Sequence, residues 1–156
     1  MRLTKLIVTF FYIGHAKIAP GSIASLATSL LFYLFAKYLI YYFFIIIILA
    51  TIFIAFFCIR IYTDKLPEKD RSEIVIDEVV GQSIALLPLL LFSETSSPDF
   101  FMCIISLLFF RFFDIVKPFP VSYFDKQHKN FFGIIMDDIM AGLYTMLIIY
   151  LVSFIF

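Results

Sequence analysis

The sequence predicts an all-α protein, an integral membrane helical bundle of about five membrane-embedded helices plus a short N-terminal helix. Three observations predict this class. Of the 156 residues, 63% are hydrophobic and only 15% are charged. The mean hydropathy is +1.03, which is more apolar than soluble globular domains are. The apolar residues form long runs, with most charges between them. We expect one membrane-embedded domain over residues 1–156.

Charge and cysteine content argue against two other classes. The formal net charge is zero, so no basic surface indicates nucleic acid as a partner. The two cysteines, Cys58 and Cys103, both lie inside apolar runs, where a free cysteine packs as a small hydrophobic residue. Neither begins a Cys-x5-Arg loop, so the sequence gives no sign of a cysteine phosphatase.

The N-terminal segment is expected to lie at the membrane rather than across it. Residues 6–13 are apolar but too few to span a bilayer, and they lack a small-residue cleavage site. A loop with two glycines and a proline follows, and Ser22 is predicted to be the N-cap of the next helix. This loop fits either an ordinary capped turn or an anion site, in which free backbone N–H groups act together with Lys17.

The rest of the chain divides into apolar spans and polar connections. Residues 23–59 carry one charge, Lys37, and have the length of two helices joined by a tight turn near that lysine. The predicted third, fourth and fifth spans are 74–92, 100–116 and 139–156. Pro88 is expected to kink the third span. The charged segment 60–73 is expected to be a solvated connector, and the segment 121–132 is polar.

Two predicted helices begin with a pair of acidic residues and continue with a glycine. Gly81 follows the Asp77-Glu78 pair, four residues after Asp77, and Gly142 follows Asp138 at the same spacing. Residues four apart share one face of a helix, and a glycine on that face lets another helix approach closely. The acids are explained either as metal ligands or as favourable charges at helix N-termini.

The distribution of basic residues predicts the topology. They cluster within 2–17, 60–71 and 117–129, whereas the loops near Lys37 and at 93–99 are poor in them. The positive-inside rule therefore places the N-terminus and these three clusters in the cytoplasm. With five spans, the four polar stretches of the chain meet at the cytoplasmic face: 14–22, Asp77-Glu78, 111–117 and Asp137-Asp138.

The residue types at this face suit phosphoryl chemistry with Mg²⁺. Carboxylates are the oxygen ligands that Mg²⁺ prefers, and basic side chains and helix starts bind phosphate. The side chains of Arg111, Asp114 and Lys117 share one face of a helix. An alternative interpretation is that Arg111 and Asp114 simply form an ion pair. The candidate metal ligands are Asp77, Glu78, Asp114, Asp137 and Asp138. The candidate phosphate-binding residues are Lys17, Ser22, Arg111 and Lys117.

The chain resembles the phosphatidylglycerophosphatase A family at these residues. The matching motifs are Ala19-Pro20-Gly21-Ser22 with Ser25-Leu26, Ile76-Asp77-Glu78 with Gly81, Arg111-x-x-Asp114-x-x-Lys117-Pro118-x-Pro120, and Gly133-Ile134-x-Met136-Asp137-Asp138-x-x-Ala141-Gly142. They occur in the family's order and cover most of the chain. The sequence departs from the family at Ser22, Ala24 and Ile76, where the family usually has Thr, Gly and Trp, and none of these changes removes a charged group.

The resemblance implies an enzyme of phospholipid biosynthesis. The family hydrolyses phosphatidylglycerophosphate, a membrane phospholipid, to phosphatidylglycerol and phosphate in a Mg²⁺-dependent reaction at the bacterial inner membrane. A multi-pass protein with its active site on the cytoplasmic face is therefore expected. We expect Asp77, Asp114 and Asp138 to be the catalytic residues, with either water or an aspartate as the nucleophile.

Two alternatives come from other functional classes. A divalent-cation transporter would use paired intramembrane acids along a path, but here the acids are expected at one face only. A membrane phosphotransferase of the CDP-alcohol type would need an Asp-x-x-Asp and Asp-x-x-x-Asp arrangement, which this sequence lacks. Neither histidine, His15 or His128, lies in an acid-phosphatase motif, so a phosphohistidine intermediate is not expected.

Overall fold

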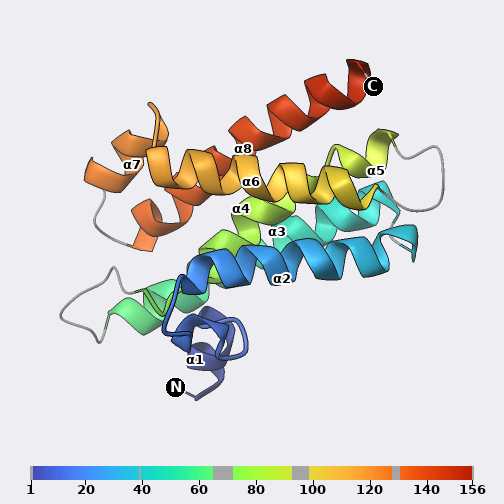
Figure 1. Ribbon diagram of the computed structural model, residues 1–156. Helices are drawn as coiled ribbons and strands as arrows, with labels where there is room; N and C mark the ends of the chain where they lie inside the picture. Colours follow the sequence, from blue (N-terminus) through green and yellow to red (C-terminus); the bar gives the residue numbers. More distant parts are fainter. Residues whose placement is uncertain (1, 39, 65–71, 93–98, 128–130, 156) are drawn as a thin grey trace.

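The structure is a bundle of helices (Figure 1). It is a computed structural model that describes residues 2–38, 40–64, 72–92, 99–127 and 131–155. Every regular element within these ranges is a helix, which confirms the predicted all-α class. The elements are α1 (Arg2–Val8), η1 (Ile13–His15), α2 (Pro20–Phe35), η2 (Ala36–Tyr38), α3 (Tyr41–Thr63), α4 (Ile76–Leu86), α5 (Leu89–Phe92), α6 (Phe100–Val116), α7 (Val121–Gln127) and α8 (Phe131–Ile155).

Helix α4 is the centre of the bundle. It packs most extensively against α8 and also contacts α2, α3 and α6. Because neighbours surround it, nine of its eleven residues are buried, among them Val80, Ala85 and Leu86, which have no exposed surface. The start of α4 is therefore held from several sides, and that start carries Asp77 and Glu78.

The N-terminal segment supports the start of α4. In Figure 1, α1 is seen nearly end-on, so it crosses the direction of the bundle helices. The Val75 N–H donates a hydrogen bond of 3.0 Å to the carbonyl of Val8, and both residues are fully buried. A methyl group at Gly14 would overlap the carbonyl of Glu73, so this glycine allows the loop to pack tightly against the chain that leads into α4.

Two helices are long and apolar enough to cross a membrane, α3 over its whole length and α8 over Phe131–Val152. Only 22% of the most apolar window of α3 is buried, and large side chains such as Tyr42 and Phe53 are about three-quarters exposed. The core helix of a soluble protein would be mostly buried. The predicted third span is divided instead: α4 ends at Leu86 and α5 begins after Pro88, where the missing N–H interrupts the helix.

Two predicted helix starts were wrong. Helix α2 begins at Pro20, with Ala19 as N-cap in the left-handed region at φ 44°, so Ser22 lies inside the first turn rather than at the cap. Proline suits the first helical position because its missing N–H would be unpaired there anyway.

Helix α8 begins at Phe131, six residues before the Asp137-Asp138 pair with which this helix was expected to begin. Tertiary contacts explain the earlier start, because Phe131 packs edge-on against Phe56 at 5.0 Å and lies under the guanidinium of Arg60 at 5.6 Å. The polar segment before it also contains a helix, α7. The central parts of the predicted connectors at 60–73 and 93–99, and His128, lie outside the described residues.

Candidate active site

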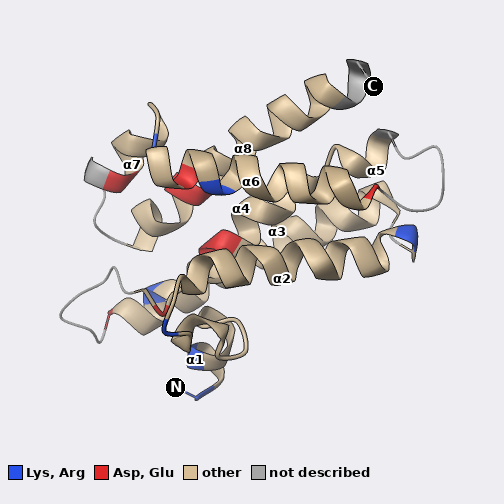
Figure 2. Cartoon of the chain, in the orientation of Figure 1, with Lys and Arg blue, Asp and Glu red and all other residues tan. Residues whose placement is uncertain are grey.

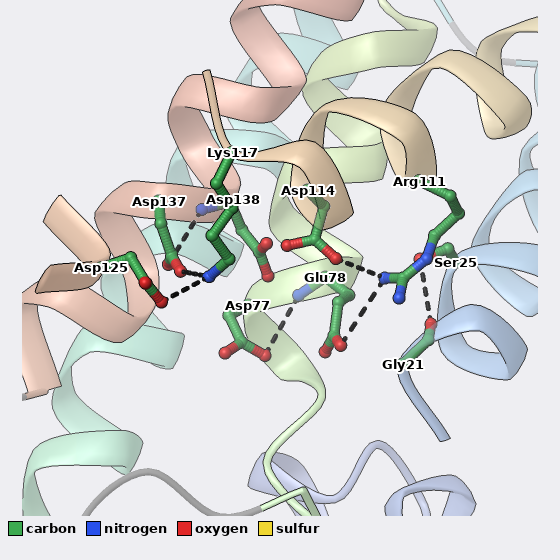
Figure 3. Close-up of polar contacts among 10 residues, drawn as sticks. All are labelled: Gly21, Ser25, Asp77, Glu78, Arg111, Asp114, Lys117, Asp125, Asp137 and Asp138. Carbon is green, nitrogen blue, oxygen red and sulfur yellow. Dashed lines mark hydrogen bonds and ion pairs between the residues drawn. The ribbon is translucent and has the colours of Figure 1, made fainter. Parts of the chain in front are cut away.

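Most of the charged residues that Figure 2 colours lie toward one end of the bundle, where α2 and α4 begin and α6 ends. Helices that are far apart in the sequence contribute to this end of the bundle. Their side chains point toward one another in the close-up (Figure 3). The predicted convergence of the acidic pairs with the segment 111–117 is therefore confirmed as geometry.

A crossing of two glycines brings the acids together. A methyl group added at Gly142 would overlap the carbonyl oxygen of Gly81, and one added at Gly81 would lie 2.6 Å from the carbonyl oxygen of Asp138. The backbones of α4 and α8 are thus in direct contact. Because Asp77 lies one turn before Gly81, and Asp138 one turn before Gly142, the same crossing places their carboxylates side by side.

Three carboxylates form the centre of the site. Oxygen atoms of Asp77, Glu78 and Asp138 all lie within 4.8 Å of one another. Asp77 is 7% exposed and Asp138 4% exposed, and the Oε2 atom of Glu78 is buried with no hydrogen-bond partner among the described atoms. Like charges this close and this buried repel strongly, so the arrangement calls for a cation.

The location of Asp138 distinguishes between the two explanations of the acidic pairs. Asp77 and Glu78 do lie in the first turn of α4, where a negative charge also favours the helix dipole. Asp138, in contrast, is the eighth residue of α8. The dipole's influence falls off within the first turn, so a favourable charge at a helix N-terminus does not explain why Asp138 is there.

Arg111 flanks the carboxylates on the side of α2. Its Nη1 atom is 2.9 Å from Asp114 Oδ2 and 3.8 Å from Glu78 Oε1. Neither contact is a hydrogen bond, and the buried Nε atom also has no hydrogen-bond partner among the described atoms. Gly21, at the start of α2, makes room for this arrangement, because a methyl group there would overlap the Glu78 carboxylate.

Lys117 flanks the carboxylates on the other side. Its ammonium donates to Asp125 Oδ1 at 2.6 Å and to Asp137 Oδ2 at 2.7 Å. Partial burial acts to lower the pKa of Lys117, but the two hydrogen bonds and the negative charges outweigh it, so the pKa is raised above its ordinary value. Lys117 is therefore held as a cation between two carboxylates.

The remaining predicted residues lie near the start of α2. Lys17 is exposed in the loop before this helix, and Ser22 is half-buried in its first turn. Among the described residues, no hydrogen bond or ion pair joins Lys17 to the carboxylates. The Gly21 carbonyl accepts a hydrogen bond from Ser25 Oγ at 3.0 Å, which turns that hydroxyl along the helix.

Sequence reasoning missed Asp125. It lies in a polar segment with no motif around it, and only the fold of α7 carries it to Lys117, eight residues earlier. A helical signal in this segment was present, because Val121 and Phe124 are apolar and three residues apart.

The charge balance of the site agrees with a bound divalent cation. The two basic groups, Arg111 and Lys117, face six carboxylates: Asp77, Glu78, Asp114, Asp125, Asp137 and Asp138. A phosphate would add further negative charge. Carboxylate oxygens are the donors that Mg²⁺ prefers, so the residues present fit this ion.

The resemblance to known proteins extends over almost the whole chain. The family model described as phosphatidylglycerophosphatase A matches residues 6–153. The chain belongs to this family. All four clusters that meet at the site lie within the matched range. No solved structure matches the chain.

Curated relatives carry two different names. A phosphatidylglycerophosphatase A of Haemophilus influenzae is 36% identical over 85 residues, covering 54% of this chain and 48% of that protein. One of Escherichia coli is 28% identical over 155 residues, covering 95% and 82%. A protein of Bacteroides thetaiotaomicron named as a putative phosphatidylinositol-3-phosphatase is 31% identical over 155 residues, covering 94% and 91%. The alignment with the first of these thus spans about half of that relative.

Proposed function

We propose that this protein hydrolyses the terminal phosphate of phosphatidylglycerophosphate, giving phosphatidylglycerol and inorganic phosphate. The observation that carries the proposal is the buried group of Asp77, Glu78 and Asp138, within 4.8 Å of one another and beside Arg111. Acids that can hold a cation next to a guanidinium with unpaired N–H groups suit a phosphate monoester. Family membership and the names of two curated relatives support the same substrate.

The proposed cofactor is Mg²⁺, held by Asp77, Glu78 and Asp138. The unpaired Oε2 atom of Glu78 supports this assignment, because a buried carboxylate oxygen needs a donor or a cation. When bound, the ion would neutralise phosphate oxygens and polarise the bond to the leaving group. Asp114 and Asp137 already face basic groups, at 2.9 and 2.7 Å, so they are assigned as supporting acids rather than as the central ligands.

The side chains of this chain suggest a division of labour. Arg111 would bind the phosphate through its Nε and Nη1 atoms, with Ser22 and the N-terminal end of α2 beside it, and Asp114 would hold the guanidinium in place. Oxygen from water ends on phosphorus as the P–O bond to the glycerol breaks, and the leaving oxygen takes a proton. Either water attacks directly, or one of Asp77, Asp114 and Asp138 attacks first and water then hydrolyses the phosphoenzyme.

The proposed location is the bacterial inner membrane, with the site on the cytoplasmic face. The exposed apolar surface of α3 supports burial in lipid. The positions of the polar stretches support one-sided placement, because α2 and α4 begin, and α6 ends, where the charges gather (Figure 2). In α8, no charged residue follows Asp138 as far as Val152, which argues against a cation path through the membrane.

A second candidate substrate is phosphatidylinositol 3-phosphate. It is favoured by the Bacteroides relative, whose name refers to that activity and whose alignment covers most of both chains. Both lipids carry a phosphate monoester on a headgroup that also bears hydroxyls, so the same phosphate site would serve either of them.

The test is phosphate release by the purified protein in mixed micelles that contain one lipid at a time. We expect release from phosphatidylglycerophosphate with Mg²⁺, none with excess chelator, and recovery when Mg²⁺ is restored. Faster release from phosphatidylinositol 3-phosphate would transfer the proposal to that lipid. Full activity in excess chelator would overturn the metal assignment, and Mg²⁺ uptake by proteoliposomes without phosphate release would favour a transporter.

A further inference from the structure

The Lys117 ammonium joins two helices across the corner that follows α6. It donates to Asp125 in α7 and to Asp137 in α8, at 2.6 and 2.7 Å. An ammonium has three N–H donors, so these two contacts leave one for any further acceptor. To bind a phosphate as well, Lys117 would need to use that donor or give up one of the two carboxylates.

The backbone of this corner is also fixed. Lys117 is the C-cap of α6 and lies in the left-handed region at φ 48°, which is unfavourable for a residue with a side chain. Two residues later, the carbonyl of Phe119 accepts a hydrogen bond of 2.6 Å from the hydroxyl of Tyr144. Asp137 and Tyr144 are seven residues apart, so they share one face of α8. The corner is thus attached to that face at two points, two turns apart.

Asp125, one of the two acids that contact Lys117, lies in the short helix α7, which has one buried end. Val121, the first residue of α7, is fully buried, whereas the Asp125 side chain, one turn later, is 36% exposed. The contact with Lys117 therefore ties the outer end of α7 to the site. Through Lys117, the orientation of α7 is linked to Asp137.

Asp137 is adjacent to a member of the central carboxylate group. Consecutive residues of a helix point about 100° apart, so Asp137 turns toward Lys117 while Asp138 turns toward Asp77 and Glu78 (Figure 3). An attachment at Asp137 sets the rotation of α8 about its axis at this level. Rotation of α8 would carry Asp138 away from the other two carboxylates.

We propose that Lys117 and Asp125 are positioning residues: their bridge to Asp137 fixes the rotation of α8 and so holds Asp138 in the metal-binding group. This assignment, which rests on the proposed function, separates the two basic groups of the site. Arg111, with unpaired N–H groups, binds the phosphate, whereas Lys117 holds the helices in position. Asp125, which no motif includes, becomes part of the active-site structure.

The experiment compares Lys117→Met, Asp125→Asn and the double variant with the wild-type protein. The double variant has the same formal net charge as the wild type, so a change in its Mg²⁺ affinity does not come from net charge. We expect calorimetry to show that it binds Mg²⁺ about tenfold more weakly, as is typical when a residue that orients a metal ligand is lost. Asp64→Asn, at the exposed C-cap of α3, is the matched control and should bind Mg²⁺ like the wild type.

Kinetics and hydrogen exchange distinguish a positioning role of Lys117 from a role in binding the phosphate. At saturating Mg²⁺, Lys117→Met should lower kcat and leave KM unchanged, and adding Asp125→Asn should cause little further loss. Amide exchange in α7 should be faster in both single variants. A higher KM with unchanged kcat in Lys117→Met, or wild-type Mg²⁺ affinity in the double variant, would overturn the proposal. If Lys117→Met does not fold, Asp125→Asn still provides the test, because it replaces a partly exposed side chain and should fold.

The binding and exchange measurements do not depend on the substrate. If the wild type releases phosphate from neither lipid, the proposed function fails, while weaker Mg²⁺ binding and faster exchange in the variants would still support the bridge. If the wild type is active and the variants bind Mg²⁺ and exchange as it does, the bridge fails and the proposed function stands.

Discussion

Gly81 and Gly142 are in backbone contact where α4 crosses α8, with the carbonyl of Gly81 in the place that a side chain at Gly142 would occupy. Each glycine follows an acid of the central group by four residues. The close crossing and the close carboxylates are therefore consequences of one packing arrangement. This relationship explains why a residue with no chemistry of its own recurs beside each acidic pair.

The crossing predicts that Gly142→Ala destabilises the protein and weakens metal binding together. The added methyl group must push α4 and α8 apart, at a cost of about 1–3 kcal/mol in unfolding free energy. Thermal unfolding in detergent and Mg²⁺ titration would measure the two effects. Ala50→Val adds volume on an exposed face of α3 and should change neither. Normal stability and normal Mg²⁺ affinity in Gly142→Ala would contradict the close contact.

Asp138→Asn is predicted to abolish turnover in a folded protein, because asparagine keeps the shape of the side chain but loses the charge that a cation needs. Asp77→Asn and Glu78→Gln should act similarly. If Asp77 and Glu78 only served the dipole of α4, each loss would cost about 0.3–1 kcal/mol of stability and leave the activity of the folded fraction intact. Specific activity per folded protein, over a Mg²⁺ series, distinguishes these outcomes. A loss that higher Mg²⁺ restores would mark the residue as one ligand among several.

Gly21→Ala is predicted to raise KM for the lipid. A methyl group at Gly21 would overlap the Glu78 carboxylate and would lie 3.4 Å from Arg111 Nη1, so the side chains on either side of the phosphate position must shift. The compensating change is Glu78→Asp, which shortens the acid by one methylene. The pair should bind lipid better than Gly21→Ala alone does. If Gly21→Ala alone has the wild-type KM, the start of α2 does not border the phosphate site.

The proposed topology predicts that the ends of α3 and α8 lie on opposite sides of the membrane. A reporter inserted after Asp64, which follows α3, should be cytoplasmic, because α3 ends on the side of the bundle where the charged residues of the site lie. A reporter after Phe156 should be periplasmic, since α8 leads away from the acids. Accessibility of each reporter to a membrane-impermeant reagent in intact cells would test this. If both reporters lie on the same side of the membrane, the proposed topology is wrong.

The sequence alone predicted the all-α class, which the structure confirms, and a site for a metal ion and a phosphate, which stays a prediction. Long apolar runs with few charges permit only helices in a bilayer, because the backbone must pair its own N–H and C=O groups there. The acids that remain stand out for the same reason, since charge beside apolar spans is costly. The i, i+4 spacing of Asp138 and Gly142 already predicted a close helix contact.

Only the tertiary structure decided how these residues pair with one another. Phe131 extends α8 because it packs against Phe56 and Arg60, and this earlier start removes Asp138 from the helix N-terminus. Lys117 pairs with Asp125 and Asp137 rather than remaining free. Such pairings depend on how helices rotate and cross, and those angles are set by contacts between residues far apart in the chain. Local spacing indicated that a helix comes close at Gly142, but not which side chains pair across the contact.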